Sequence, residues 1–260
     1  MQKEPFVSVL IANYNNSSYI QQCINSLNSQ TYKNLEIIFF DDNSSDNSLE
    51  IIKKFSNVKI IENKIQTKFA SLNQLNGFKK AAALSKGELI FLLDSDDYFN
   101  EEKIEKVVGY FRDNKKAKIF FNFPFIVENK NIYEDKIENK LIKTYWSYIH
   151  PTSCISIRKD CFDELLKTTS YKDFTDIWLD LRICLFSKYI LKDFHIINEY
   201  LTFYRKTVTS EESKFKKFSK NWWKRRMQAH QFFQKFSKDN NLKFGKNLDF
   251  FVTKIICKFL

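Results

Sequence analysis

Residues 86–99 read KGELIFLLDSDDYF, and this stretch decides the expected fold. In the segment ELIFLL (88–93), the five apolar residues after Glu88 are typical of a strand buried on both faces, and the run stops at an acidic turn. In that turn Asp94 and Asp96 are one residue apart, a spacing at which two carboxylates can hold one divalent cation. Hard oxygen ligands suit Mg²⁺ or Mn²⁺, so we expect one of these ions as a cofactor. The alternative interpretation is a solvated turn whose acids cap the next helix.

The residues before this stretch repeat the order of apolar strand, polar turn and helix. Apolar runs end at a cluster of Asn and Ser after Ala12 and at the pair Asp41-Asp42. The expected strands are 6–12, 35–40, 58–61 and 88–93, and the expected helices begin near Asn47, Leu72 and Asn100. Strands that alternate with helices predict an α/β fold with a mainly parallel sheet covered on both faces. Because such sheets bind ligands beyond the carboxyl ends of their strands, we expect the three polar turns to meet in one site.

The residues beyond Asp113 follow a less regular pattern. The expected strands there are 119–125, 155–157 and 201–204, and the expected helices are 176–186 and a long basic helix from Lys214. The final segment, 248–260, is apolar at helical spacing. We expect one domain at 1–210, with a regular first half (1–113) and a less regular second half (114–210), followed by a basic amphipathic helical extension at 211–260.

The formal charge of +11 points to an anionic partner, and part of it is local. Ser213 to Lys238 contains nine Lys or Arg and no Asp or Glu. Over 214–238 the cations alternate with aromatic residues, which suits an interfacial helix on an anionic membrane, with Trp222 and Trp223 near the headgroups. The alternative is a helix that packs its aromatic residues onto the catalytic domain. No recognised nucleic-acid-binding module accompanies the charge, so we expect no nucleic-acid partner.

Cysteine usage and hydropathy indicate the compartment. The five cysteines are scattered and form no CxxC pair, which is typical of reduced cytoplasmic thiols. Neither a secretory signal nor an apolar run of the roughly 18 residues that a membrane span requires is apparent. We therefore expect a cytoplasmic protein that associates peripherally with the inner face of the plasma membrane.

Three segments carry a family resemblance: PFVSVLIANYN (5–15), LEIIFFDDNSSDNS (35–48) and KGELIFLLDSDDYF (86–99). Their order and spacing resemble those of the inverting GT-A glycosyltransferases of family 2, which build bacterial polysaccharides, and a looser similarity extends to about Arg205. The resemblance implies a GT-A fold and a nucleotide-diphosphate sugar as donor, with UDP favoured. It implies that 1–210 is the catalytic domain, with 1–113 as the nucleotide-binding half and 114–210 as the acceptor-binding half. It also implies that the acceptor is a hydroxyl of a glycan or lipid-linked glycan, in the synthesis of a surface polysaccharide or glycoconjugate.

The resemblance also assigns roles in donor binding. Tyr14 would stack on the donor base, and Asp42 would accept hydrogen bonds from the imide edge of that base. Asp94 would contact the ribose, and Asp96 would ligate the metal. The expected donor-binding set further includes Ala12, Ser95, Lys68 and Arg205. For Lys68 and Arg205 the alternative is an ordinary solvated cation.

An inverting transfer also needs a general base for the acceptor hydroxyl. The family commonly places this base in an acidic pair just before a Trp-containing helix, and the corresponding stretch here is YKDFTDIWLD (171–180). The usual Glu-Asp pair is absent, so Asp176 and Asp173 compete for the role. Asp176 is favoured because it stands at the start of the expected helix. The alternative is that both residues only cap that helix.

His150, in the segment HPTSC, is a weaker candidate for a contact with phosphate or acceptor, and the alternative is a structural histidine. The family often has a metal-reaching histidine after the Tyr-Arg pair. Lys206 and Thr207 occupy that region here, so a histidine ligand is not expected.

Two other functions compete with this interpretation. Phosphatases of the haloacid dehalogenase type also place a DxD motif after a buried strand, but there the motif normally opens the fold, whereas here three strands precede it. A non-catalytic protein that binds membranes or polyanions through a degenerate transferase fold would explain both the missing acidic pair and the basic helix.

Overall fold

The computed structural model describes residues 4–129, 131–135, 144–146, 148–207 and 214–260. Its strands are β1 (Val7–Asn13), β2 (Leu35–Asp41), β3 (Val58–Glu62), β4 (Leu89–Asp94), β5 (Tyr98–Phe99), β6 (Ile119–Glu128), β7 (Asn131–Glu134), β8 (Ile155–Arg158) and β9 (His195–Arg205). Its α-helices are α1 (Ser17–Asn28), α2 (Ser48–Ile52), α3 (Ala70–Leu84), α4 (Lys103–Asp113), α5 (Lys159–Thr169), α6 (Leu179–Phe186), α7 (Lys220–Asp239) and α8 (Leu248–Lys258). A 3₁₀ turn at Thr152–Cys154 precedes β8, and a π-helical turn at Ser187–Leu191 extends α6.

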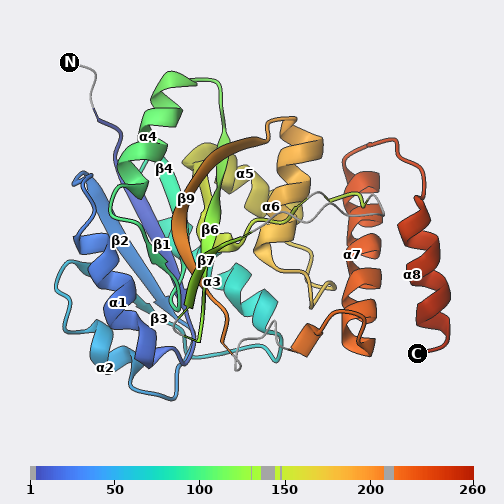
Figure 1. The fold of residues 1–260 in the computed structure, drawn as a ribbon, viewed down its shortest axis with the longest axis horizontal. Coiled ribbons are helices and arrows are strands. Elements are labelled where there is room, and N and C mark those ends of the chain that lie inside the picture. Colours follow the sequence, from blue (N-terminus) through green and yellow to red (C-terminus); the bar gives the residue numbers. More distant parts are fainter. Residues whose placement is uncertain (1–3, 130, 136–143, 147, 208–213) are drawn as a thin grey trace.

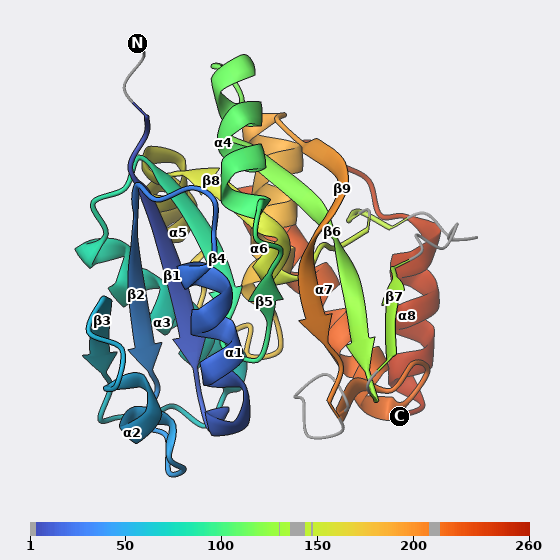
Figure 2. The same ribbon diagram turned by 60° about the vertical axis from the view of Figure 1, so that its left-hand side comes forward.

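The strands form one mixed sheet in the order β3-β2-β1-β4-β8-β6-β9-β5, with β7 paired to β6. The first half is parallel throughout, because β1 pairs in parallel with both β2 and β4, and β2 pairs in parallel with β3. The second half begins with β8, which runs antiparallel to both β4 and β6. Figures 1 and 2 show helices on both sides of this curved sheet. The predicted α/β architecture is confirmed.

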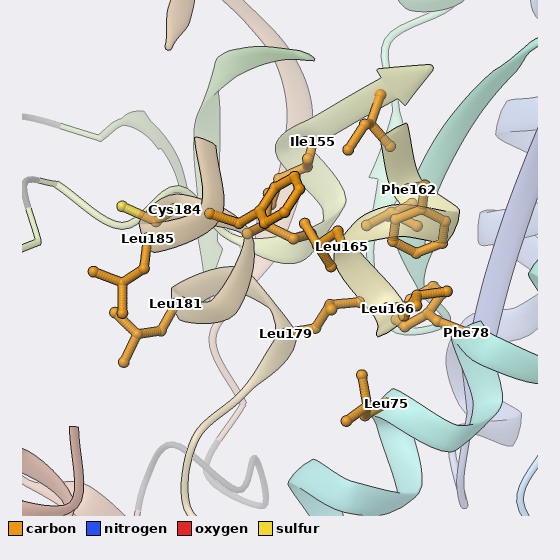
Figure 3. Close-up of a cluster of buried hydrophobic side chains, with 14 of the residues drawn as sticks. Leu75, Phe78, Ile155, Phe162, Leu165, Leu166, Leu179, Leu181, Cys184 and Leu185 are labelled. Carbon is orange, nitrogen blue, oxygen red and sulfur yellow. The ribbon is translucent and has the colours of Figure 1, made fainter. Parts of the chain in front are cut away.

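Both faces of the parallel strands are buried, which explains their continuous apolar runs. Along β1, Val9 and Ile11 belong to one apolar cluster with side chains of α1 and α4, whereas Leu10 belongs to the opposite cluster. Figure 3 shows part of this opposite cluster, where Phe78 of α3 lies beside Phe162 and Leu166 of α5, and the leucines of α6 extend the cluster away from α3. Because the side chains of a strand alternate between its faces, a single strand contributes to both cores.

The second half departs from the sequence prediction in several boundaries. The strand expected at 201–204 is the end of β9, which begins at His195, and the helix expected at 176–186 begins only at Leu179. The helix expected to start after Asn100 begins at Lys103, where the Asn100 side chain accepts from the backbone N–H of Glu102 at 3.0 Å. Helix α5 and the short strands β5 and β7 were not predicted.

Part of the C-terminal extension packs into the core of the main domain. Helix α7 begins at Lys220, not at Lys214, and its Phe232, Phe233 and Phe236 belong to the same core cluster as the sheet. The boundary expected between residues 210 and 211 lies outside the described residues. Figures 1 and 2 place α8 at the edge of the molecule, outside α7. In the described part of the chain, no helix combines the length and apolar character needed to cross a membrane.

The close approach of the turn before β4 to β1 gives a stability prediction. A Cβ added to Gly87 would lie 2.4 Å from the backbone nitrogen of Ser8, which cannot move without disturbing the β1 register. We expect Gly87→Ala to lower the free energy of unfolding by about 1–3 kcal/mol in urea denaturation. Gly109→Ala is the matched control, because a Cβ in that part of α4 meets only a terminal nitrogen of Arg112 at 4.0 Å. It should raise stability by about 0.5–1 kcal/mol, and an equal effect of both changes would contradict the packing described here.

Candidate functional site

Neighbouring parallel strands bring the polar turns to one edge of the sheet. Asn13, at the end of β1, lies in register with Asp41 of β2. On its other side β1 places Ala12 in register with Asp94 of β4. The Asn13 amide donates to the Asp41 carboxylate at 2.7 Å, and the backbone N–H of Asp42 donates to the Asn13 carbonyl at 2.9 Å. The turns after β1, β2 and β4 therefore lie together at the carboxyl ends of the strands.

Asp42 is held in a fixed orientation at this edge. It is 6% exposed, and each of its carboxylate oxygens accepts a hydrogen bond. Asn63 donates to one oxygen at 2.7 Å and Gln66 to the other at 3.0 Å, both from the loop between β3 and α3. Tyr14, in the turn after β1, is 51% exposed, so its ring is accessible to a planar ligand. No periodic signal in the sequence singled out Asn63 or Gln66.

A network of buried hydrogen bonds fixes the acidic turn after β4. Ser153, in the 3₁₀ turn, donates to the Asp97 carboxylate at 2.5 Å and accepts from the backbone N–H of Asp94 at 3.0 Å. Lys103 is fully buried and donates to the carbonyl of Ser153 at 2.5 Å. Asp97 is buried and hydrogen-bonded, whereas Asp94 and Asp96 are each partly exposed.

Ionisation of the acidic turn is opposed by burial and by mutual repulsion. Burial, followed by the charge of Asp96, raises the pKa of Asp94 to about 7, although a hydrogen bond from Gln74 at 2.9 Å opposes the shift. Burial likewise raises the pKa of Asp96, against the charge of Arg205. Burial and the neighbouring charges raise the pKa of Asp97 well above its usual range. A divalent cation beside Asp94 and Asp96 would offset this repulsion.

The side chains of the turn fit Mg²⁺ or Mn²⁺ in their chemistry. Asp94 and Asp96 offer hard carboxylate oxygens, and their mutual repulsion favours a bound cation. Among the residues that the structure describes, no group of three or more His, Cys, Asp or Glu is arranged to hold a metal ion. The remaining ligands would therefore have to be diphosphate oxygens and water, which is how proteins commonly bind Mg²⁺ at phosphate sites.

Arg205 lies against the acidic turn at the end of β9. Its guanidinium donates to the backbone carbonyl of Asp96. The same group lies 4.8 Å from the ring centroid of Tyr19 and 4.8 Å from that of Tyr98, so two aromatic faces hold it. A permanent positive charge thus stands beside the carboxylates.

Two other members of the predicted donor-binding set lie differently. Lys68 is exposed just before α3, and its ammonium lies 5.1 Å from the ring centroid of Phe69, so its contact with the donor stays a prediction. The Ser95 side chain is fully buried, and its hydroxyl accepts from the amide of Asn16 at 2.9 Å. The membership of Ser95 in the donor-binding set stays a prediction. The Ser95 hydroxyl links the turn after β4 to the turn after β1.

His150 is a buried residue in an aromatic cluster. It is 1% exposed, its Nδ1 lies 2.9 Å from the carbonyl of Asn122, and its ring packs against Phe121, Phe123 and Tyr148. Burial lowers the pKa of His150 to about 4, so the ring is neutral near pH 7. The structure therefore does not support the predicted contact of His150 with phosphate or acceptor, and it favours the structural alternative.

The acidic segment before α6 contains the predicted general base. Asp173 is exposed, whereas Asp176 is half-buried. The backbone N–H of Asp176 donates to Gln228 of α7 at 2.7 Å, and the Gln228 amide returns a hydrogen bond to the Asp176 carboxylate at 3.3 Å. Because α6 begins at Leu179, Asp176 precedes the helix and does not start it, which corrects the reason for favouring it. Its fixed orientation now distinguishes it from Asp173.

Helix α3 connects this segment to the acidic turn. Ser71, in its first turn, donates to the carbonyl of Thr175 at 2.5 Å, and Gln74, one turn later, reaches Asp94. The charge of Asp180, in the first turn of α6, also contributes to the raised pKa of Asp94. Asp180 was not a candidate on sequence grounds. The structure adds it to the acidic side chains that act on the site.

The sequence of the chain is similar to those of known glycosyltransferases. The model of the family described as Glycosyl transferase family 2 matches residues 8–172. An uncharacterized glycosyltransferase of Nostoc sp., alr2836, is 26% identical over 212 residues, which are 76% of this chain and 64% of the relative. The Escherichia coli protein WfaP, named a UDP-Glc:alpha-D-GlcNAc-diphosphoundecaprenol beta-1,3-glucosyltransferase, is 36% identical over 125 residues, 45% of this chain and 44% of that protein. The chain thus spans less than two thirds of either relative.

A solved structure shares the fold. Residues 1–349 of S. aureus TarS in complex with UDP-GlcNAc superpose with a TM-score of 0.63 at 16% sequence identity, covering 87% of this chain and 66% of that one. At this identity the likeness shows the fold alone, and it confirms the GT-A architecture that the sequence predicts.

Proposed function

Because the chain belongs to glycosyl transferase family 2, we propose that it transfers a sugar from a nucleotide-diphosphate donor to a hydroxyl of a glycan or lipid-linked glycan. A UDP-sugar is the favoured donor, since the TarS structure is a complex with UDP-GlcNAc and the name of WfaP specifies UDP-Glc. The diphosphoundecaprenol in the name of WfaP supports a lipid-linked acceptor. The reaction would serve the synthesis of a surface polysaccharide or glycoconjugate.

The observation that carries this proposal is that three carboxylates lie at the same edge of the sheet, at the ends of two strands that flank β1. Asp42 stands at the end of β2, and Asp94 and Asp96 stand at the end of β4, with the Arg205 guanidinium beside them. A nucleotide-diphosphate sugar has groups that suit this edge. Its base offers N–H donors to a carboxylate, and its anionic diphosphate suits the Arg205 guanidinium and a bound divalent cation. Tyr14 would stack on the base, Asp42 would accept from its imide edge, and Asp94 would contact the ribose.

The reaction would be a single in-line displacement with inversion. Bound Mg²⁺ or Mn²⁺, with Asp96 as its protein ligand, would neutralise the diphosphate leaving group. Arg205 would add a second positive charge beside that group. A carboxylate of the segment 173–180 would remove the proton of the acceptor hydroxyl as its oxygen attacks the anomeric carbon, with Asp176 favoured. The acceptor hydroxyl would attack the anomeric carbon from the side opposite the diphosphate leaving group. Because this displacement is a single step, no covalent glycosyl-enzyme would form.

A thermal-shift screen of nucleotide-sugars with and without Mn²⁺ tests the donor. A cognate donor at about 100 times its Kd should add about 2.7 kcal/mol of stability, which for a protein of this size raises Tm by roughly 5–10 °C. The shift should require Mn²⁺ and should exceed that of the nucleoside monophosphate, which serves as the control. A screen in which no nucleotide-sugar raises Tm in Mn²⁺ would count against the proposal.

The family membership sets aside the phosphatase alternative. The non-catalytic alternative predicts a different outcome in a transfer assay, namely no donor turnover above background.

Peripheral attachment to an anionic membrane stays part of the proposal, but some aromatic side chains of helix α7 are buried and so cannot contact the membrane. Phe233 and Phe236 lie in the core, and Trp222 and Trp223 are only partly exposed, so the packing alternative holds for the second half of α7.

A further inference from the structure

Helix α8 turns an apolar side away from the protein. Leu248, Phe251, Ile255 and Phe259, here called the α8 stripe, recur at three- and four-residue steps and are between 49% and 85% exposed. The opposite side, which faces α7, buries Phe250 at 6% exposure together with two polar residues: Asp249 is 3% exposed and Thr253 is fully buried. A surface helix in water normally keeps its exposed side polar, which α8 does not. Contiguous exposed apolar surface of this kind marks a site of interaction.

The contacts of α8 fix this orientation. The Asp249 carboxylate accepts from Nε of Arg226 at 2.9 Å, and its other oxygen lies 2.9 Å from Nε2 of the buried His230, both on α7. At the start of α8, the backbone N–H of Asn247 donates to the Tyr145 hydroxyl at 2.9 Å, and that hydroxyl donates to the Gly245 carbonyl at 2.9 Å. Because a buried ion pair holds the polar side against α7, the helix cannot rotate to bury its stripe without breaking that pair.

The charge around the stripe identifies the occupant. Residues 214–260 contain thirteen Lys or Arg and two Asp, so they account for the whole formal charge of +11. Both aspartates are engaged, Asp239 with Lys235 at 3.1 Å and Asp249 with Arg226. Within α8, Lys254 and Lys258 are exposed beside the stripe. An apolar stripe flanked by cations is the arrangement of helices that lie in the interface of anionic membranes.

We propose that the α8 stripe inserts into the headgroup region of an anionic lipid membrane, with Lys254 and Lys258 on the lipid phosphates. A second copy of the chain fits the stripe less well, because a two-fold contact would bring two sets of these lysines together. Nucleic acid fits less well because the stripe offers aliphatic and phenyl groups and no polar group for a base edge. Vesicle binding does not depend on transferase chemistry, but its use, to hold the active site near a lipid-linked acceptor, rests on the proposed function.

Vesicle flotation of the full chain, without donor, tests the proposal. The chain should float with vesicles of phosphatidylcholine containing phosphatidylglycerol and should stay unbound with phosphatidylcholine alone. The double substitution Phe251→Gln and Ile255→Gln should weaken binding by roughly tenfold or more, since both side chains would otherwise enter the interface. Lys254→Gln with Lys258→Gln should also weaken binding and reduce its salt dependence. The matched control is Ile132→Gln with Ile196→Gln, which changes two similarly exposed isoleucines in β7 and β9 and should leave flotation unchanged.

Each outcome decides the proposal. Melting followed by circular dichroism should show that both double variants keep the fold, as expected for changes of exposed side chains. Failure of the unaltered chain to float with anionic vesicles would overturn the proposal, as would flotation that ignores the changes in the stripe. Light scattering that shows dimers abolished by Phe251→Gln with Ile255→Gln, without vesicle binding, would assign the stripe to a second copy instead. A chain that floats but does not turn over donor would leave the lipid surface standing and reject the proposed function.

Discussion

Asp96→Ala is expected to lower kcat/KM for metal-dependent sugar transfer by on the order of 10³-fold, because a metal that neutralises a leaving group contributes several kcal/mol to the transition state. The loss should appear together with the loss of the Tm increase that Mn²⁺ and donor produce. Burial already disfavours the ionised form of Asp96, so its removal should leave the Tm of the metal-free protein unchanged or slightly higher. Transfer and thermal shift measured on the same preparations separate these effects.

Asp113→Ala provides the matched control for this change. Asp113 ends α4, and its side chain is 70% exposed beside Arg112. The same chemical change there should alter neither Tm nor transfer, since exposed ion pairs contribute little. Unchanged turnover of Asp96→Ala at saturating donor would reject the assignment of Asp96 as the metal ligand.

Asp176→Asn is expected to lower kcat by roughly 10²- to 10⁴-fold while leaving donor binding intact, because the variant removes only the proton acceptor. Asparagine can still accept the hydrogen bond from Gln228, so the segment should keep its conformation. The rate of nucleotide release in a transfer assay measures kcat, and calorimetry measures the affinity for the donor.

Asp173→Asn and Asp180→Asn complete the comparison. Asp173 is exposed, so its variant should keep most of the activity. The charge of Asp180 acts on Asp94, so its variant should mainly change donor or metal affinity. A loss of kcat that falls on Asp173 or Asp180, with Asp176→Asn active, would move the base to that residue.

The parallel half of the sheet was predictable because each strand is buried on both faces. Such strands are continuous apolar runs, and the polar turns that follow them mark their ends, so the prediction of 35–40 for β2 differs from the structure by one residue. Strand β7 left no such signal, because all four of its side chains are exposed. Its existence depends on pairing with β6, which local sequence does not encode.

The position of the candidate residues at the sheet edge was predictable only where they stand at or just after the end of a strand. Asp42, Asp94 and Asp96 do so, whereas the partners of Asp42 come from a loop more than twenty residues along the chain. His150 was a weaker candidate for a contact with phosphate or acceptor, but aromatic residues of β6 pack against its ring, and this contact depends on long-range packing. The aromatic pattern of 214–238 fitted a membrane helix and a packed helix equally. Tertiary packing buries the aromatic residues in the second half of α7, and four exposed apolar residues of the extension lie along α8 and its C-terminal end.

The central claim is that a divalent cation holds a nucleotide-diphosphate sugar at the carboxyl ends of the parallel strands. One assay tests this claim most directly. Release of nucleoside diphosphate from the nucleotide-sugar that raises Tm would be measured with acceptor present, first in chelator and then after addition of Mn²⁺. We predict background release in chelator and restoration by Mn²⁺, with a glycosylated acceptor formed in equal amount. Release at the same rate in chelator and in Mn²⁺, or none in either, would contradict the account.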